Sequence, residues 1–373
     1  MNPSYRIVFY VSGHGFGHTS RTIEVIHAVL RARPDAHIVV KTSAPVRLFE
    51  RTLAGRCEFV ELQCDPGMVQ IDSLNIDTGA SVRRAVEFHA RLPSLIAAEA
   101  TYLRDSSARL IVADIPPLGI AAAHAAGIPS VAVANFTWDW IYDGYVDDGA
   151  REIAGQMRRL YATAGLALRL PMAGGFGGLE AVTRDIPFVA RQSARTRDEV
   201  RIALGLPPRV TGKPLVLTSF GGYGVSRLNT QALAALKDFT IATTDSPSNT
   251  NVISPTAGLL YLSEQQIYAN GLRYEDLVRG ADVVVTKPGY GIISEAIAND
   301  TALLYTSRGH FVEYEVLVNE MPRYVRARFI DQDDLLSGNW KVALEKLLSQ
   351  PAPPEQPALN GADVAAAEIL RQG

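Results

Sequence analysis

The chain has 373 residues, of which 47% are hydrophobic and 20% charged, enough apolar residues for about two domain cores. The formal net charge is -3 and Lys and Arg are mixed with Asp and Glu along the chain, so we expect no nucleic-acid partner. The first residues lack the pattern of a signal peptide, and no run of about eighteen apolar residues occurs, so we expect no transmembrane segment.

In the first half, short apolar, β-prone segments alternate with segments of helical periodicity. The predicted strands are residues 6–12, 37–42, 58–62, 110–114 and 130–134, and predicted helices include 81–102 and 118–126. This alternation is typical of a parallel sheet with helices on both faces. The only cysteines, Cys57 and Cys64, have no second pair or His cluster to complete a zinc site, which favours the reducing cytoplasm.

The periodicity weakens between residues 166 and 209, where Gly and Pro accumulate, so we expect a domain junction there. The alternation then resumes, with predicted strands at 215–219, 240–243, 259–262, 283–286 and 302–306. We therefore predict an α/β protein with two doubly wound, Rossmann-like domains, residues 1–190 and 191–358, facing each other across a cleft. Ligands of open α/β sheets bind at the carboxyl ends of the strands, so we expect the function in those loops.

Residues 283–296 have the pattern of a buried strand, a turn with Gly289 and Gly291, and a helix. Glycines let a ligand approach the backbone, and the free N–H groups at the start of a helix suit a diphosphate. We expect Ser294 to add a hydroxyl donor and Glu295 to accept hydrogen bonds from two ribose hydroxyls, both from the first helical turn. An ordinary strand-to-helix turn shows the same pattern.

A second glycine turn follows the strand at 215–219, with Gly221 and Gly222 in succession. Such pairs are common where a strand turns tightly into a helix, but two turns suited to phosphate in one domain favour phosphate binding. Lys287, at the end of its strand, either adds a cation to the diphosphate or lies in solvent.

The loop after the first strand reads Gly-His-Gly-Phe-Gly-His and places two histidines at the predicted cleft. Histidine is suited to taking a proton from a hydroxyl at neutral pH, so His14 is the first candidate for a general base and His18 the second. Alternatively, His18 caps the helix or packs in the cleft, and His14 only bonds a loop. Asp114 either orients His14, meets an acceptor or caps the next helix. Arg21 either binds an anion or lies on the helix surface.

An aromatic cluster follows the strand at 130–134 and includes Trp138, with Asp139 beside it. Flat aromatic faces next to a carboxylate suit a sugar ring, although an apolar cluster at a domain interface has the same composition.

Three segments resemble the donor-binding half of GT-B glycosyltransferases, among them the peptidoglycan GlcNAc-transferase family. They are Phe220-Gly-Gly, Lys-Pro-Gly-Tyr-Gly-Ile-Ile-Ser-Glu-Ala at 287–296 and Arg-Gly-His-Phe-Val-Glu-Tyr at 308–314. Residues 270–277 and 134–142 resemble more closely the glycosyltransferase-like N-terminal region of plant L-arabinokinases. The similarity spans nearly the whole chain.

The resemblance implies that the C-terminal half holds a nucleotide sugar, usually a UDP-sugar. The diphosphate would lie near Gly221, Gly222, Gly289 and Gly291, beside Tyr290. Glu295 would bind the ribose, and Arg308 and Glu313 would lie near the sugar. Where relatives have Gln or Asn after the acidic residue, this chain has Tyr314, so the sugar stays open. In similar folds a C-terminal helix, here within 359–373, crosses back to the first domain.

These observations predict a glycosyltransferase that moves a sugar from a nucleoside diphosphate to an acceptor hydroxyl, and the resemblance implies that the transfer proceeds with inversion. His14 would take the proton, and helix N-termini would stabilise the leaving diphosphate, so we expect neither a metal nor a cofactor beyond the nucleotide-sugar co-substrate. Two alternatives stay open: an epimerase or hydrolase of nucleotide sugars, and a non-catalytic module that senses them. The sequence indicates neither the acceptor nor the oligomeric state.

Overall fold

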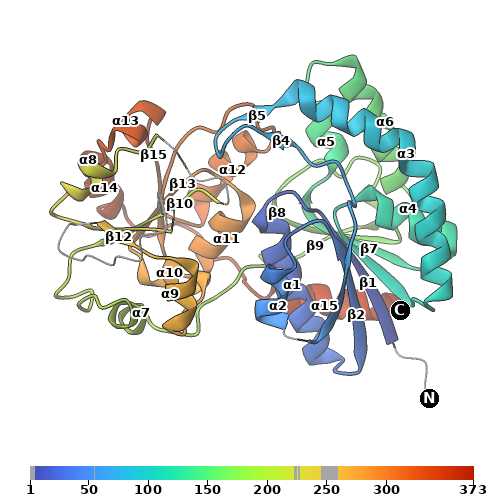
Figure 1. Ribbon diagram of the computed structural model, residues 1–373, viewed down its shortest axis with the longest axis horizontal. Helices are drawn as coiled ribbons and strands as arrows, with labels where there is room; N and C mark the ends of the chain where they lie inside the picture. The colour runs from blue at the N-terminus through green and yellow to red at the C-terminus, as the bar shows by residue number, and fades with distance from the viewer. Residues whose placement is uncertain (1–4, 54, 222–224, 226, 245–258) are drawn as a thin grey trace.

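The computed structural model describes residues 5–53, 55–221, 225, 227–244 and 259–373. It shows two α/β halves side by side, each built around a parallel sheet (Figure 1). Within the described residues, we find no helix with the length and apolar character needed to cross a bilayer.

The N-terminal half contains a seven-stranded sheet in the order β3-β2-β1-β6-β7-β8-β9. Its strands are β1 (Tyr5–Val11), β2 (Ala36–Thr42), β3 (Cys57–Glu61), β6 (Leu110–Asp114), β7 (Ser130–Phe136), β8 (Leu166–Gly174) and β9 (Thr183–Asp185). Helices cover both faces, so β6 and β7 are buried throughout. Val11 pairs with both Thr42 and Asp114, so these strand ends form one edge of the sheet.

Among the described residues before the first crossing, six α-helices and one short 3-10 helix accompany this sheet. They are α1 (Phe16–Ala32), α2 (Arg47–Leu53), α3 (Thr78–Asp105), α4 (Pro117–Ala126), α5 (Trp138–Asp143), α6 (Asp148–Tyr161) and η1 (Glu180–Val182). α3 begins where the Asp77 carboxylate accepts a hydrogen bond from the Ala80 N–H. α4 ends at Gly127, whose left-handed φ of 72° suits glycine.

β8 and β9 lie in the segment where the sequence predicted only a junction. Pro171 and Gly174 fall inside β8 and interrupt its strand pattern, since proline donates no ladder hydrogen bond and glycine packs no side chain. The sheet of the N-terminal half therefore extends further along the chain than the periodicity indicates.

The C-terminal half contains a six-stranded parallel sheet in the order β12-β11-β10-β13-β14-β15. Its strands are β10 (Leu215–Ser219), β11 (Thr240–Thr243), β12 (Leu259–Tyr261), β13 (Val283–Thr286), β14 (Ala302–Tyr305) and β15 (Ala327–Phe329). The accompanying helices are α7 (Arg197–Ala203), α8 (Thr230–Ala234), α9 (Glu264–Ala269), α10 (Tyr274–Gly280), α11 (Tyr290–Ala298), α12 (Tyr314–Glu320), η3 (Met321–Arg323), α13 (Gln332–Ser337) and α14 (Lys341–Leu348).

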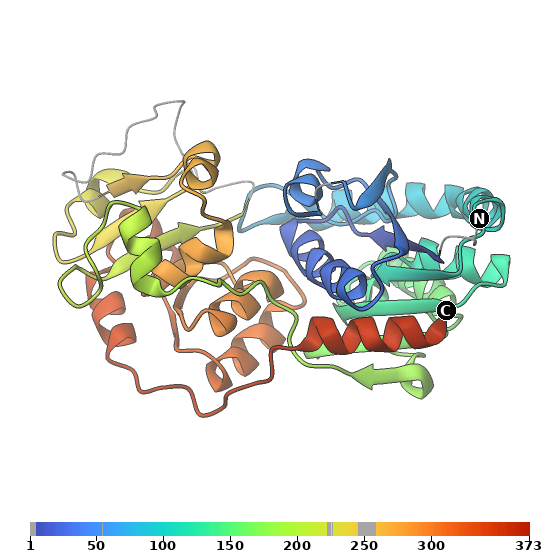
Figure 2. The same ribbon diagram turned by 90° about the horizontal axis from the view of Figure 1, so that it is seen from below.

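The chain crosses between the halves twice, after β9 and before α15 (Gly361–Gln372). α15 lies along the N-terminal half against α1 (Figure 2). The two crossings touch, because the Gly361 N–H donates to the Phe188 carbonyl at 3.0 Å. A Cβ at Gly361 would lie 2.1 Å from the carbonyl oxygen of Pro187, so only glycine fits there.

A small antiparallel hairpin, β4 (Val69–Gln70) and β5 (Ile76–Asp77), extends from the N-terminal half toward the C-terminal half (Figure 1). At its tip, the Ser73 hydroxyl donates to the Phe220 carbonyl at 2.8 Å. Leu74 is buried in the apolar core of the C-terminal half. The hairpin therefore ties the two halves together beside the loop that follows β10.

Candidate functional site

Two helices begin where the halves meet. α1 follows β1 and α11 follows β13, and a Cβ built on Gly291 would lie 3.2 Å from the Cα of Gly17. Neither helix start has a capping side chain or an acidic residue in its first turn. The first N–H groups of both helices are thus left for another partner, at the positive ends of two helix dipoles. An anion between the two helix starts would be stabilised.

Two cations lie at the same interface. Arg308 is buried, and its Nη1 donates to Oε1 of Glu313 at 2.9 Å and to the Pro288 carbonyl at 3.3 Å. Lys287 has no ion pair or hydrogen bond among the described residues, and burial together with the nearby Arg308 lowers its pKa to about 7. A second positive charge this close makes the pair a favourable site for an anion.

His18, in the first turn of α1, is buried and lies with Nδ1 2.8 Å from Oδ1 of Asp114. Arg21 donates to the same carboxylate through Nε at 2.7 Å and Nη2 at 2.5 Å, and the Thr22 hydroxyl donates to it at 2.9 Å. Burial opposes the ionisation of Asp114, but Arg21 and His18 outweigh it and lower its pKa to about 2. Asp114 is therefore an ionised carboxylate surrounded by donors.

This network favours one of the two nitrogens of His18 as the site of its proton. An ionised carboxylate only accepts hydrogen bonds, so the 2.8 Å contact with Asp114 favours a proton on Nδ1; Arg21 Nη2, 2.9 Å from the same nitrogen, makes its shorter contact of 2.5 Å with Asp114. Neutral His18 then has a free lone pair on Nε2. A His whose Nδ1–H is held by a carboxylate has the arrangement of a general base.

His14 has the opposite arrangement. Its Nδ1 accepts a hydrogen bond from the Met68 N–H at 3.2 Å, so the neutral ring carries its proton on Nε2. Burial and the neighbouring His18, Arg308 and Lys287 lower the pKa of His14 to about 3. At neutral pH, His14 can therefore donate a hydrogen bond through Nε2 but does not offer a lone pair there.

The network corrects two interpretations of Asp114 and selects, for Arg21, the alternative that it binds an anionic group. Asp114 contacts His18 and not His14, and it does not cap α4, whose N-cap is Pro116. Arg21 is not a surface residue: its side chain is 4% exposed, because it binds Asp114 and also donates to Asn135 at 2.7 Å.

Trp138 does not offer an open face to a sugar, contrary to the expectation. It is 1% exposed and stacks on His18 with ring centroids 6.4 Å apart. Its Nε1–H donates to Oδ2 of Asp65 at 2.9 Å. Trp138 thus packs against the ring of His18. This contact fits the apolar interface cluster that the sequence left as an alternative.

Asp65 was missed by the sequence analysis because it belongs to no motif. It is buried in the loop after β3, beside His18 and Trp138, and burial raises its pKa. The only signal in the sequence is its place just after a strand end, which it shares with many loop residues.

The residues expected to bind the donor are placed differently along α11. Glu295 is its sixth residue, so it lies in the second turn, where Arg191 of the first crossing donates to it through Nε at 2.7 Å. Ser294 also lies beyond the first turn, and its hydroxyl donates to the Gly291 carbonyl at 2.9 Å. Tyr290 is buried against Phe188, with ring centroids 6.2 Å apart.

The glycine turn after β10 is described only as far as Gly221. Gly221 has a φ of 79°, a left-handed conformation that suits glycine. Gly222, the second glycine of the expected phosphate turn, lies outside the described residues. Gly289 is the N-cap of α11 and has an extended backbone.

No known family model matches the chain. In sequence, the chain is 32% identical over 372 residues to L-arabinokinase of Arabidopsis thaliana. That match covers 98% of this chain but 34% of the relative, so the chain spans about a third of the relative's length.

In structure, the chain is similar to CalG4, the calicheamicin glycosyltransferase, with a TM-score of 0.62 at 14% identity over 100% of this chain and 96% of that one. For MurG of Acinetobacter baumannii the TM-score is 0.56 at 13% identity, and the match covers 99% of this chain and 100% of that one. For UGT2 of Phytolacca americana, in complex with UDP-2fluoro-glucose and pterostilbene, the TM-score is 0.57 at 14% identity. The match covers 98% of this chain and 93% of that one.

The chain has the GT-B fold. The predicted α/β architecture of two Rossmann-like halves is thereby confirmed. The predicted resemblance to GT-B glycosyltransferases and to L-arabinokinase is confirmed as well. In this GT-B chain, the uncapped helix starts, the two cations and the His18 network all gather at the interface of the two halves.

Proposed function

We propose that the chain is a glycosyltransferase that transfers a sugar from a nucleoside diphosphate, UDP in the first place, to an acceptor hydroxyl. The observation that carries this proposal is the meeting of two uncapped helix starts at Gly17 and Gly291, beside Lys287 and Arg308. Helix N-termini and cations together suit a diphosphate. A UDP-sugar analogue is bound by the structurally similar UGT2, which supports the choice of nucleotide.

Within this proposal, the nucleotide sugar binds to the C-terminal half. The backbone at Gly221, Gly289 and Gly291 approaches the diphosphate, and Lys287 adds a cation. Glu295 binds the ribose, with Arg191 fixing its carboxylate. Arg308 and Glu313 meet the sugar. The halves are in contact at Gly17 and Gly291, so the donor enters when they separate.

We assign the role of general base to His18 instead of His14. The Nε2 lone pair of His18 takes the proton of the acceptor hydroxyl, and the acceptor oxygen forms a bond to the anomeric carbon. The bond from that carbon to the diphosphate oxygen breaks, its electron pair leaves with the diphosphate, and the configuration inverts. His14 donates its Nε2–H to an oxygen of the bound substrates.

The leaving diphosphate gains negative charge, which Lys287, Arg308 and the two helix starts stabilise. These positive groups can serve in place of a divalent cation, so we propose a reaction that needs no metal. Cys57 and Cys64 are both free thiols, in keeping with the cytoplasm as the place of the reaction.

Calorimetric titration with UDP, TDP and GDP sugars tests the binding part of the proposal. We expect a UDP-sugar to bind, and Lys287→Met to weaken it by about tenfold through loss of a charge-assisted contact. Absence of binding by every nucleotide sugar would refute the proposal.

Turnover with and without an acceptor separates the proposed transferase from the two alternatives. Rapid breakdown or epimerisation of the donor without acceptor would indicate the hydrolase or epimerase. If the chain binds a nucleotide sugar without turning it over, and His18→Gln binds it equally well, the chain is a sensing module.

A further inference from the structure

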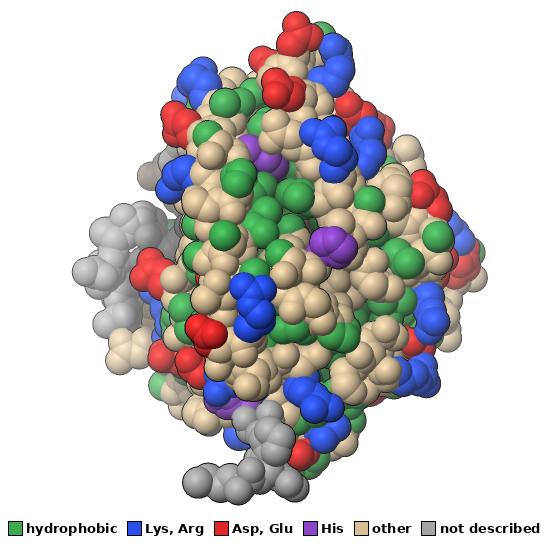
Figure 3. Space-filling model, turned by 90° about the vertical axis from the view of Figure 1, so that its right-hand side faces the viewer, with side chains coloured by type: hydrophobic (Ala, Val, Ile, Leu, Met, Phe, Trp, Pro, Cys, Tyr) green, Lys and Arg blue, Asp and Glu red, His purple; other side chains and the backbone are tan. Residues whose placement is uncertain are grey.

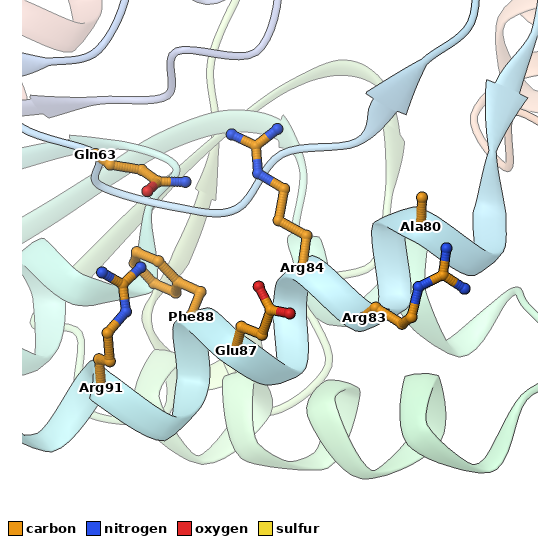
Figure 4. Close-up of a pocket in the computed structure, with 7 residues that line it drawn as sticks. All are labelled: Gln63, Ala80, Arg83, Arg84, Glu87, Phe88 and Arg91. Atoms are coloured by element: carbon orange, nitrogen blue, oxygen red, sulfur yellow. The ribbon is translucent and has the colours of Figure 1, made fainter.

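A cavity of about 410 Å³ lies on the N-terminal half, between α3 and the loop after β3. Its charged and polar lining is Gln63, Arg83, Arg84, Glu87 and Arg91, and Phe88 contributes an apolar wall. Figure 4 shows Arg84 and Arg91 pointing from α3 to the side on which Gln63 lies, with Glu87 between them along the helix. The volume falls in the range of about 300–1,000 Å³ that small-molecule sites occupy.

The three arginines of this cavity have no partner within the described chain. Arg83, Arg84 and Arg91 are exposed, and no ion pair or side-chain hydrogen bond is formed by any of them among the described residues. Other arginines of this half, such as Arg47, are also exposed and unpaired among the described residues, but Arg83, Arg84 and Arg91 all line one cavity.

The charge of the cavity is strongly one-sided. Glu87 is the only acidic residue in the lining, against three guanidinium groups. Guanidinium groups offer a planar fork of N–H donors that matches the oxygens of a phosphate or a carboxylate. On the face drawn in Figure 3, basic and acidic side chains are interspersed and form no basic band of the kind that follows a nucleic-acid backbone. A small anionic group therefore fits the cavity best.

The cavity is joined to the candidate reaction centre by a single loop. Gln63 lies at the cavity, while Gly67 accepts a hydrogen bond from Tyr142 at 2.9 Å and packs against His14. The next residue, Met68, donates to the His14 ring. Four residue steps from Gln63 to Gly67 span at most about 14 Å.

We propose that this cavity binds the anionic group, a phosphate or a carboxylate, of the acceptor substrate and thereby holds its hydroxyl toward His18. The inference rests on the proposed glycosyltransferase function and names the chemical class of its acceptor.

The first test measures anion binding while the donor site is filled. The full chain is saturated with UDP and then titrated with inorganic phosphate at low chloride concentration. We expect the double variant Arg84→Gln/Arg91→Gln to bind phosphate about tenfold more weakly than the wild type. Arg47→Gln is the matched control, because Arg47 is an exposed arginine on α2 outside the cavity, and it should bind phosphate as the wild type does.

Unchanged UDP affinity in the double variant shows that it is folded and that the donor site is intact. Equal phosphate binding by the double variant and the wild type overturns the proposed anion site. If UDP itself does not bind to the wild type, the proposed function is contradicted. The titration with UDP, which precedes the addition of phosphate, shows this outcome.

The second test distinguishes an acceptor group from a free anion. Transfer is compared between acceptors that differ only in charge, glucose against glucose 6-phosphate and glucose against glucuronate. We expect the charged member to have the higher kcat/KM by about tenfold or more, and the double variant to lose that preference. A cavity that binds phosphate without any preference for charged acceptors would overturn the acceptor assignment.

Discussion

Gly17 of α1 and Gly291 of α11 lie in backbone contact across the two halves, and the contact is asymmetric. A Cβ on Gly291 would come within 3.2 Å of the Gly17 Cα, whereas a Cβ on Gly17 would meet nothing closer than the Gly291 nitrogen at 3.8 Å. The absence of a side chain at Gly291 is thus what lets the two helix starts approach.

This asymmetry predicts different outcomes for two alanine variants. Alanine in place of a helical glycine stabilises a protein by about 0.4–1 kcal/mol when it fits. Gly17→Ala should therefore raise the free energy of unfolding by about 0.5 kcal/mol. Gly291→Ala should gain nothing or lose stability, because Gly17 must move. Urea denaturation of both variants measures the difference, and equal stabilisation would show that the helix starts do not touch in solution.

The two histidines are predicted to differ in kind. His18→Gln should lower kcat by about 10²–10⁴-fold because it removes the base. Asp114→Asn should lower it by about a hundredfold, because Nδ1 of His18 loses the carboxylate that fixes its tautomer. His14→Gln keeps an N–H donor and should cost less than about tenfold.

The measurement is kcat under donor and acceptor saturation, with UDP affinity as the control for folding. A loss in His14→Gln as large as that in His18→Gln would contradict the assignment of the base to His18.

We predict that Lys287 takes up a proton when a diphosphate binds. Its pKa is lowered from 10.5 to about 7, so at pH 8.5 the amine of the free protein is mostly neutral. A bound diphosphate favours the charged amine and raises its pKa again, so UDP affinity should fall as the pH rises from about 7 toward 10.5. Calorimetry at pH 8.5 in buffers of different ionisation enthalpy should show uptake of up to one proton.

The control is the Lys287→Met variant, which should show no proton uptake on UDP binding. The folded chain binds fewer protons than the unfolded chain between pH 7 and 10.5, so this lysine also makes stability rise with pH in that window. Uptake that persists in Lys287→Met would assign it to another group.

Glu295 binds Arg191, and two variants can separate that contact from the ribose binding proposed above. Glu295→Ala leaves Arg191 without its nearest partner and should lower the free energy of unfolding by about 1–3 kcal/mol. Glu295→Gln keeps an acceptor for Arg191 and should cost less. Because neither variant offers a full carboxylate to the ribose, UDP affinity should fall by about tenfold in both. If only Glu295→Ala weakens UDP binding, the carboxylate is structural and does not bind the ribose.

The strands could be predicted from the sequence where both faces are buried. The segments 110–114 and 283–286 coincide with β6 and β13, because a short continuous apolar run bounded by turns is typical of a buried strand. The hairpin β4–β5 could not be predicted, since its strands have two residues each and show no period. Its buried tip residue, Leu74, depends on contacts with a domain that follows much later in the chain.

The candidate site was predictable in its loops but not in its pairings. The partner of Asp114 lies 96 residues away from it, and the partner of Glu295 lies 104 residues away. One signal was available: His18, Arg21 and Thr22 are spaced i, i+3 and i+4, so they share one face of α1. A basic group, a base and a hydroxyl on one face indicate a shared acidic partner, which favours His18 over His14.

The contact between Gly361 and the Pro187–Phe188 backbone joins the two segments of chain that cross between the halves. Both chain crossings pass through that point, so neither can shift without displacing the other. If the halves separate to admit a donor, we expect them to rotate about this joined crossing. Entry of the donor and release of the nucleoside diphosphate would then depend on the same rotation. A bulkier residue at position 361 would therefore impair both steps.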